Sequence, residues 1–114
     1  MSRIAEYIKS FRTFRGISQQ ELGARLGRTA NVISNWEKGK NDPDLDSIEM
    51  MCKVFQITPN ELFGWEDNKE LIAYLQEKEK LNLEIDRINR AKATLDEQLL
   101  QYKERIENLK KHSK

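Results

Sequence analysis

The chain has 114 residues, of which 34% are charged and 38% are hydrophobic, so it offers material for one compact domain and an appendage but excludes a single large core. Its net charge of +1 hides an uneven distribution: residues 1–40 carry eight basic and three acidic side chains, residues 41–66 one and six, and the remainder eleven and ten. The basic first third keeps nucleic acid among the expected partners.

The single cysteine and the apolar runs bear on compartment and cofactors. Cys52 has no second cysteine for a disulfide and no Cys/His cluster beside it, so we expect a small buried core residue, no metal and no cofactor. The sequence has no apolar run of about 18 residues, and its first residues lack the apolar stretch of a signal peptide. These features predict a cytoplasmic protein without a membrane span.

Residues that start and end helices are dense in the first 64 positions. Residues 4–15 carry apolar side chains at helical spacing, and Gly16 follows as a helix-ending residue. Ser18 and Glu21 have the spacing of a capping box for a second helix, which Gly27 ends. The sequence therefore predicts two short helices before residue 28.

Three more short helices are expected before residue 65. Thr29 is placed to cap a third helix that runs to about Lys38 and buries Ile33 and Trp36. A fourth helix, capped by Asp44, has as its apolar residues Leu45, Ile48, Met51, Cys52 and Phe55. Thr58 and Glu61 have the spacing of a capping box for a fifth helix, again with no sign of a strand. The predicted fold class is all-α.

The rest of the chain differs from the first 64 residues in its composition, because no glycine or proline occurs from Trp65 to Lys114. Asp67 and Glu70 are placed to cap a new helix there. With position a of a heptad set at residue 71, ten of the twelve a and d positions are apolar or aromatic, as in coiled coils. The expected dimer seam is Leu71, Tyr74, Lys78, Leu81, Ile85, Ile88, Lys92, Leu95, Leu99, Tyr102, Ile106 and Leu109. A helix of about 45 residues would be roughly 65 Å long, so it needs a partner helix.

Two lysines in this seam bear on how the helix pairs. Lys78 and Lys92 at a positions weaken the seam but favour a defined low-order assembly, most simply a parallel two-stranded coil. The e and g positions are not strongly complementary in that arrangement. The partner, a second copy or another protein's helix, and the orientation of the two helices therefore stay open.

The segment from Ser18 to Gly39, SQQELGARLGRTANVISNWEKG, resembles the XRE/Cro-type helix-turn-helix family of phage and bacterial repressors. The resemblance extends over about residues 3–64. It implies a five-helix DNA-binding domain over residues 1–66. The heptad pattern indicates that a coiled-coil dimerisation helix follows over residues 67–114. The resemblance also implies that double-stranded DNA is the partner of the third helix.

The outer face of the third helix is short, polar and nearly uncharged once Ile33 and Trp36 are buried. Asparagine amides pair with adenine, and small apolar groups contact the thymine methyl. The expected base contacts are Ala30, Asn31, Val32, Ser34 and Asn35.

The resemblance also implies contacts with the DNA backbone from residues that flank the third helix and from the start of the second. The expected phosphate contacts are Gln19, Thr29, Lys38, Lys40 and Asn41, together with Arg28, which departs from the family at a commonly apolar position and could reach a phosphate instead. Arg12 and Glu37 match a family pair that forms an internal salt bridge. Gly23 replaces the family's usual alanine and Ala30 a longer base-reading residue, so the operator sequence does not carry over.

Together these features predict a homodimeric repressor that binds a palindromic operator with half-sites about one DNA turn (~34 Å) apart. The alternative is an interaction protein, such as an antitoxin or an adaptor, whose long helix binds another protein. No enzyme is expected, because His112 is the only histidine, no glycine-rich phosphate loop is present and no nucleophile has a base nearby.

Overall fold

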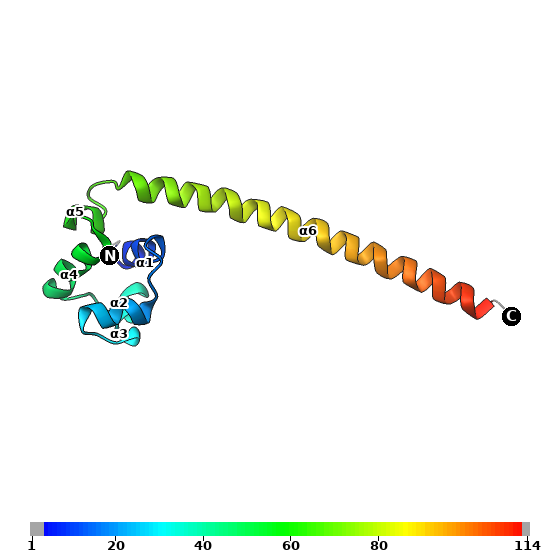
Figure 1. Ribbon diagram of the computed structural model, residues 1–114, viewed down its shortest axis with the longest axis horizontal. Helices are drawn as coiled ribbons and strands as arrows, with labels where there is room; N and C mark the ends of the chain where they lie inside the picture. Colours follow the sequence, from blue (N-terminus) through cyan, green and yellow to red (C-terminus); the bar gives the residue numbers. More distant parts are fainter. Residues whose placement is uncertain (1–3, 113–114) are drawn as a thin grey trace. The chain divides into compact units, whose positions relative to one another are not determined.

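The computed structural model describes residues 4–112 and contains helices but no strand within that range. The helices are α1 (Ile4–Phe14), α2 (Gln19–Leu26), α3 (Ala30–Glu37), α4 (Leu45–Phe55), α5 (Pro59–Leu62) and α6 (Lys69–His112), shown in Figure 1. The predicted all-α class, with five short helices followed by one long helix, is confirmed.

The short helices share one apolar core, to which each contributes at least one buried side chain. Its largest fully buried members are Phe11, Phe55, Ile8, Leu22, Ile33, Met51 and Leu62. The rings of Phe11 and Phe55 stack with centroids 6.1 Å apart. Helices of four to eleven residues are too short to persist alone in water. Burial, at roughly 1.5–3 kcal/mol for each large apolar side chain, therefore holds them in place.

One apolar residue expected on the core face of α4 is not there. Met51, Cys52 and Phe55 are buried, whereas the side chain of Leu45 is 81% exposed. Leu45 is the first residue of α4 and lies on the wall of an open groove between α4 and α5. The first turn of α4 is covered on one side only, because Ser47 is 3% exposed in the same turn.

Side-chain caps fix where several of the helices begin. The Ser18 hydroxyl accepts a hydrogen bond from the Glu21 backbone N–H at 3.0 Å. The expected capping box is only half formed there, because the Glu21 carboxylate accepts a hydrogen bond from Arg25 instead. At α5 the box is complete: Thr58 and Glu61 each accept a hydrogen bond from the other's backbone N–H.

The cap of α6 lies one residue later than the sequence predicts. The Asn68 side-chain oxygen accepts a hydrogen bond from the Leu71 backbone N–H at 2.9 Å, and its amide donates to Glu61 Oε2 at 2.6 Å. Asn68 therefore starts α6 and ties that start to α5, which Asp67 does not do. The second bond depends on tertiary contact, so local spacing alone could not select between the two residues.

The first turns of α6 belong to the packed domain. Leu71 is 2% exposed, and the Tyr74 ring lies 5.1 Å from that of Phe14 between centroids. The chain divides into two compact units after Tyr74. Leu71 is therefore covered by its own domain, which corrects its assignment to the dimer seam. The predicted domain boundary after residue 66 stays a prediction. The packed core includes Leu71, which lies after that boundary.

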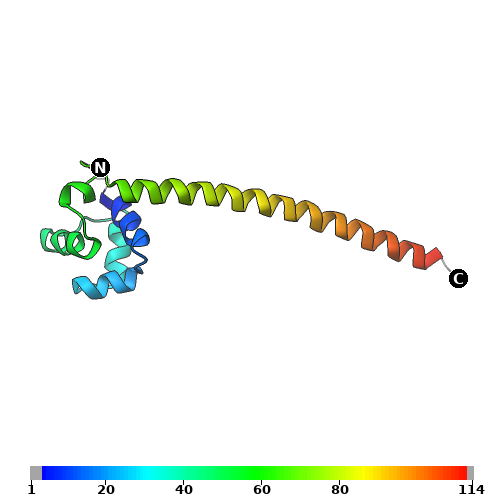
Figure 2. The ribbon, with the colours of Figure 1, turned by 45° about the horizontal axis from the view of Figure 1, so that its top comes forward.

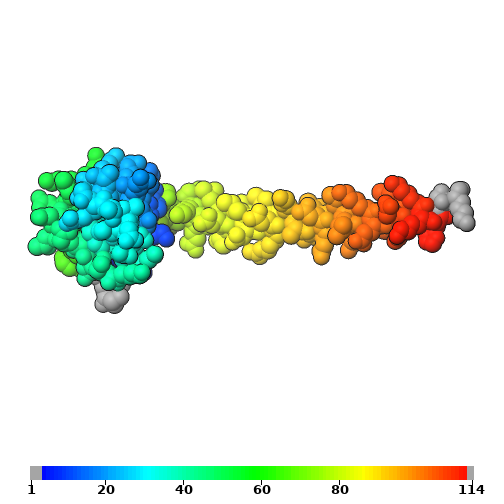
Figure 3. Space-filling model, turned by 90° about the horizontal axis from the view of Figure 1, so that it is seen from below, coloured from blue at the N-terminus to red at the C-terminus, as the bar shows by residue number. Residues whose placement is uncertain are grey.

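The second unit begins at Leu75 and is a single helix as far as His112, and Figure 2 shows that the ribbon of α6 has no break. The space-filling view in Figure 3 shows its side chains at the surface along its length. Its apolar seam residues are between 51% and 70% exposed from Leu81 to Leu109. None of the helices between residues 4 and 112 combines the length and apolar character that a membrane crossing requires.

Candidate nucleic-acid interface

The turn between α2 and α3 is short and sharply defined. Gly27 ends α2 in the left-handed region at φ 68°, a conformation that favours glycine. The Thr29 hydroxyl then accepts a hydrogen bond from the Val32 backbone N–H at 3.3 Å and caps α3. Thr29 therefore fixes the first turn of the helix that the sequence assigns to DNA.

Gly23 lets this turn lie directly against α2. A Cβ atom at this position would be 2.8 Å from the Arg28 carbonyl oxygen and 3.0 Å from the Thr29 carbonyl carbon. The Arg28 backbone N–H also donates to the Gly23 carbonyl at 2.7 Å. The glycine that replaces the family's usual alanine therefore has a structural reason, which is the close approach of two backbones.

α3 is anchored on one side and accessible on the other. Ile33 is fully buried and Trp36 is 5% exposed. Of the five expected base contacts, Asn31 is exposed, whereas Ala30, Ser34 and Asn35 are half-buried. Val32 is also half-buried and packs against the core. All five lie on one helix, and Asn31 is the most accessible of them.

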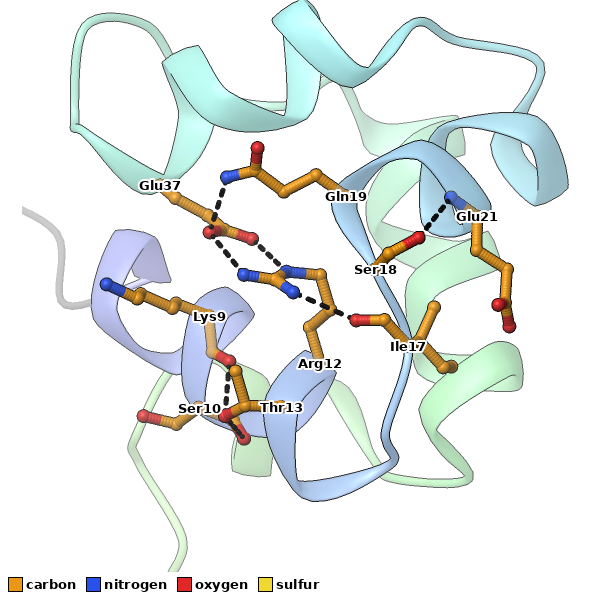
Figure 4. A network of polar contacts seen from close by, with 9 residues as sticks. All are labelled: Lys9, Ser10, Arg12, Thr13, Ile17, Ser18, Gln19, Glu21 and Glu37. Atoms are coloured by element: carbon orange, nitrogen blue, oxygen red, sulfur yellow. Dashed lines mark hydrogen bonds and ion pairs between the residues drawn. The ribbon is translucent and has the colours of Figure 1, made fainter.

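The end of α3 is held by an ion pair with α1, which Figure 4 shows together with its polar neighbours. Arg12 Nε donates to Glu37 Oε2 at 2.6 Å and Arg12 Nη2 donates to Glu37 Oε1 at 3.0 Å. Arg12 Nη1 also donates to the Ile17 carbonyl at 2.9 Å. The two charged side chains are 11% and 4% exposed. This two-pronged geometry fixes α3 relative to α1.

Gln19 belongs to the same network, a role that sequence reasoning missed. Its Nε2 donates to Glu37 Oε1 at 3.1 Å, across from the Arg12 guanidinium. An amide has two N–H donors, so one N–H of Gln19 is used by Glu37 and the second is left for another acceptor. No sequence signal links Gln19 to Glu37, because they meet only through the packing of α2 on α3.

Basic side chains follow the anchored end of α3. Lys38 is the C-cap residue of α3, and Lys38, Lys40 and Asn41 are exposed. The charge of Glu37 is matched by Arg12, so it does not cancel the two lysines. This end of α3 therefore presents positive charge, which suits a phosphate backbone.

Arg28, expected to contact phosphate, is engaged within the chain. Its Nη2 donates to Asp44 Oδ1 at 3.0 Å, and the Ser47 hydroxyl donates to the same oxygen at 2.6 Å. The hydrogen bond from Ser47 and then that from Arg28 lower the pKa of Asp44 to about 2. Asp44 is the N-cap residue of α4, but its carboxylate makes no cap bond to the backbone. It joins the α2–α3 turn to α4 instead.

The chain is similar in sequence to known DNA-binding regulators. The family described as "Helix-turn-helix" matches residues 8–62. An uncharacterized HTH-type transcriptional regulator of Methanocaldococcus jannaschii is 31% identical over 62 residues, which cover 54% of this chain and 94% of that protein. The HTH-type transcriptional activator BcrR of Enterococcus faecalis is 32% identical over 78 residues, or 68% of this chain. The match spans only 37% of the length of BcrR.

Solved structures of similar domains agree with the sequence comparisons. The P22 c2 repressor, solved in complex with a synthetic operator, is 28% identical with a TM-score of 0.50, covering 53% of this chain and 91% of that one. The controller protein C.AhdI of Aeromonas hydrophila is 26% identical with a TM-score of 0.51, covering 54% and 94%. The chain belongs to the XRE/Cro-type helix-turn-helix family of DNA-binding transcriptional regulators, which is not a family of enzymes.

Proposed function

We propose that the chain is a sequence-specific repressor that binds a palindromic operator as a homodimer, with α3 in the major groove. The observation that carries this proposal is the two-sided character of α3. Ile33 and Trp36 anchor one side in the core, while Asn31 lies exposed on the other. A helix held this way presents its polar face to base edges in a fixed orientation.

Asn31 is the principal base contact in this proposal, because its amide is accessible and an amide pairs with adenine through two hydrogen bonds. Asn35 and Ser34 are half-buried beside it and contribute further polar contacts. Ala30 and Val32 are the proposed contacts to thymine methyl groups. The sequence preference at each half-site then depends mainly on one exposed amide.

Backbone contacts position α3 and add affinity that is independent of sequence. Lys38, Lys40 and Asn41 are exposed at the end of α3 and form the proposed main phosphate clamp. Gln19 contributes its second N–H at the start of α2, where backbone N–H groups also favour anions.

Thr29 and Arg28 complete the proposed phosphate contacts. The Thr29 hydroxyl accepts from the backbone of α3 and still has its own proton to donate to a phosphate oxygen. Arg28 would exchange Asp44 for a phosphate. That exchange is feasible, because the two side chains are 41% and 47% exposed and a pair so exposed is weak.

The homodimer is supported by the exposed seam of α6. Apolar side chains that are more than half exposed, from Leu81 to Leu109, recur at a and d positions and require a partner helix. A dimer has two identical α3 helices, which suits a palindrome whose half-sites are a whole number of DNA turns apart. Repression needs no more than occupancy of the operator by such a dimer.

The same exposed seam would also suit the helix of another protein, as in an antitoxin or adaptor. The mass of the purified chain in solution separates the two functions. Light scattering should give twice the chain mass of 13.5 kDa for the homodimer. A mass of one chain would favour the alternative.

Selection from a randomised DNA library tests the reading of bases. Asn31→Ala should lose the preference at one base pair in each half-site, because bidentate amide contacts contribute about 1–3 kcal/mol of discrimination each. Asn35→Ala, at a half-buried position, is the matched comparison. Binding to unrelated DNA should barely change in either variant. If both variants select the same operator as the wild type at every position, α3 does not read sequence through these amides.

A further inference from the structure

We propose that α6 pairs antiparallel with the α6 of a second copy, in a register that sets Lys78 level with the partner's Leu109. This inference rests on the homodimer proposed above, and adds the orientation and the register. It replaces the parallel coil that the sequence alone suggests as the simplest arrangement.

The seam begins at Lys78, because the domain itself covers the earlier positions. Leu71 is 2% exposed and Tyr74 packs on Phe14. Ten a and d positions remain from Lys78 to Leu109, and eight of them are apolar or aromatic.

In an antiparallel pair each a residue lies level with a d residue of the partner, and only one register uses all ten positions. Its layers pair Lys78 with the partner's Leu109, Leu81 with the partner's Ile106, Ile85 with the partner's Tyr102, Ile88 with the partner's Leu99, and Lys92 with the partner's Leu95.

The two seam lysines distinguish the orientations. In a parallel pair Lys78 would face the partner's Lys78, and Lys92 would face the partner's Lys92, so two layers would hold like charges in an apolar seam. In the antiparallel pair each lysine lies level with a leucine of the partner. Its aliphatic stem then packs on the leucine while the ammonium group reaches solvent.

The charges beside the seam point the same way. The g positions are acidic toward the start of α6, at Glu77 and Glu84, and basic toward its end, at Arg105. An antiparallel pair brings g positions together, so Glu84 of each copy lies beside the partner's Arg105. Each dimer therefore contains two such pairs. Glu84 also contacts Arg87 within its own helix. Both of these side chains are exposed, so the Glu84 carboxylate has room to bind Arg87 and the partner's Arg105 together.

A parallel pair makes worse use of the same side chains. It brings each g position to the e position of the next heptad, which sets Glu77 and Glu84 against Asn82 and Asn89. It also sets Arg105 against the partner's Lys110. No flanking pair is then oppositely charged and one pair is repulsive, whereas the antiparallel register contains no like-charged flanking pair. The charges that flank the seam therefore favour the antiparallel orientation.

This orientation sets where the two copies leave the coil. Residue 75 lies level with residue 112 of the other copy. The two positions are then separated by about 55 Å of helix.

Pulsed electron spin resonance on the full chain measures the orientation directly. A nitroxide label on Lys110→Cys lies level with residue 77 of the partner, so the two labels should be about 50 Å apart along the coil. A parallel pair would instead set them within roughly 20 Å, because paired helix axes are about 10 Å apart, and this result would overturn the proposal. The wild-type chain, whose Cys52 is 7% exposed, controls for labelling at that site. The absence of any dipolar signal would mean that no dimer forms, so the homodimer itself would fail.

A charge reversal gives a second test that needs no label. Arg105→Glu should weaken self-association, on the order of 10-fold, because two attractive pairs with Glu84 become repulsive. In a parallel pair the same change would remove the repulsion from Lys110 and tighten association. The double variant Glu84→Arg/Arg105→Glu should restore wild-type association. An unchanged or tighter dimer for Arg105→Glu would contradict the antiparallel register.

Discussion

The two units of this chain carry apolar residues at similar helical spacing but with opposite outcomes. In the domain that ends at Tyr74, Leu22 and Ile33 have no exposed surface, whereas Leu99 in α6 is 51% exposed. In the domain, neighbouring helices of the same chain cover the apolar side chains. From Leu75 the second unit consists of α6 alone, so no other helix of that unit covers its apolar face. Periodicity thus predicts which face of a helix is apolar, but not whether the chain itself supplies the surface that covers it.

Truncation after Gln76 tests whether the domain is complete without the exposed part of α6. The shortened chain should remain folded, because Leu71 and Tyr74 are retained in their packing sites. It should be monomeric and bind the operator about 10²- to 10⁴-fold more weakly, since two linked half-site contacts become independent. Gel-shift titration and light scattering measure the two effects.

The matched control for that truncation is a cut ten residues earlier, at the predicted domain boundary. Truncation after Glu66 removes Leu71 as well and should lower the free energy of unfolding by about 1.5–3 kcal/mol relative to the longer fragment. Equal stability of the two fragments would show that α6 contributes nothing to the core. A tight dimer of either fragment would show that the seam lies elsewhere.

The Arg12–Glu37 pair tests what holds α3 inside the domain. Arg12→Met should lower the free energy of unfolding by about 3–5 kcal/mol, because it leaves the carboxylate of Glu37 buried without its cation. The double variant Arg12→Met/Glu37→Met should regain much of that loss. Urea denaturation measures both. A loss below about 1 kcal/mol in the single variant would mean that water replaces the guanidinium.

The positions of the short helices were predictable because their signals are local. Ser18 and Thr29 cap their helices within three residues, and Gly27 ends a helix by its own conformation. The candidate reading face followed from the same spacing, since burial of Ile33 and Trp36 decides what remains outside.

What the sequence could not show depends on tertiary contact. Leu71 satisfies both a heptad position and a core position, and only packing chooses between them. The Gln19–Glu37 and Arg28–Asp44 contacts join residues 18 and 16 positions apart. No local pattern encodes such a partner, so the sequence predicts a phosphate contact for Arg28 and not its pairing with Asp44.

Gly23→Ala sharpens the comparison, because helix propensity and packing predict opposite signs. Propensity alone would stabilise α2 by about 1 kcal/mol. The new Cβ atom would lie 2.8 Å from a backbone oxygen, so the turn must shift, at a net cost of about 1–3 kcal/mol. We expect lower stability in denaturation and weaker operator binding. Ala24→Gly, at an exposed position of the same helix, should show the ordinary propensity loss; a stabilised Gly23→Ala would refute the close approach.

Asp44 gives the smallest effect and a pH signature. The hydrogen bonds from Ser47 and Arg28 lower the pKa of Asp44 in the folded state to about 2, from the ordinary value of 3.8. Its ionised carboxylate therefore stabilises the folded state above pH 3.8, and this contribution is lost as the pH falls through about 2. Denaturation of wild type and Asp44→Asn over this range should show a difference in stability that vanishes at the acid end. A difference independent of pH would mean that ionisation of Asp44 contributes nothing.

The central claim is that the DNA-binding domain is complete in one chain, whereas α6 pairs with a second copy. Native mass spectrometry of the full chain bound to its selected operator tests this claim most directly. The complex should contain two chains for each duplex with two half-sites, and it should form at protein concentrations where a single half-site is hardly bound. One chain for each duplex, or equal binding to one and to two half-sites, would contradict the account.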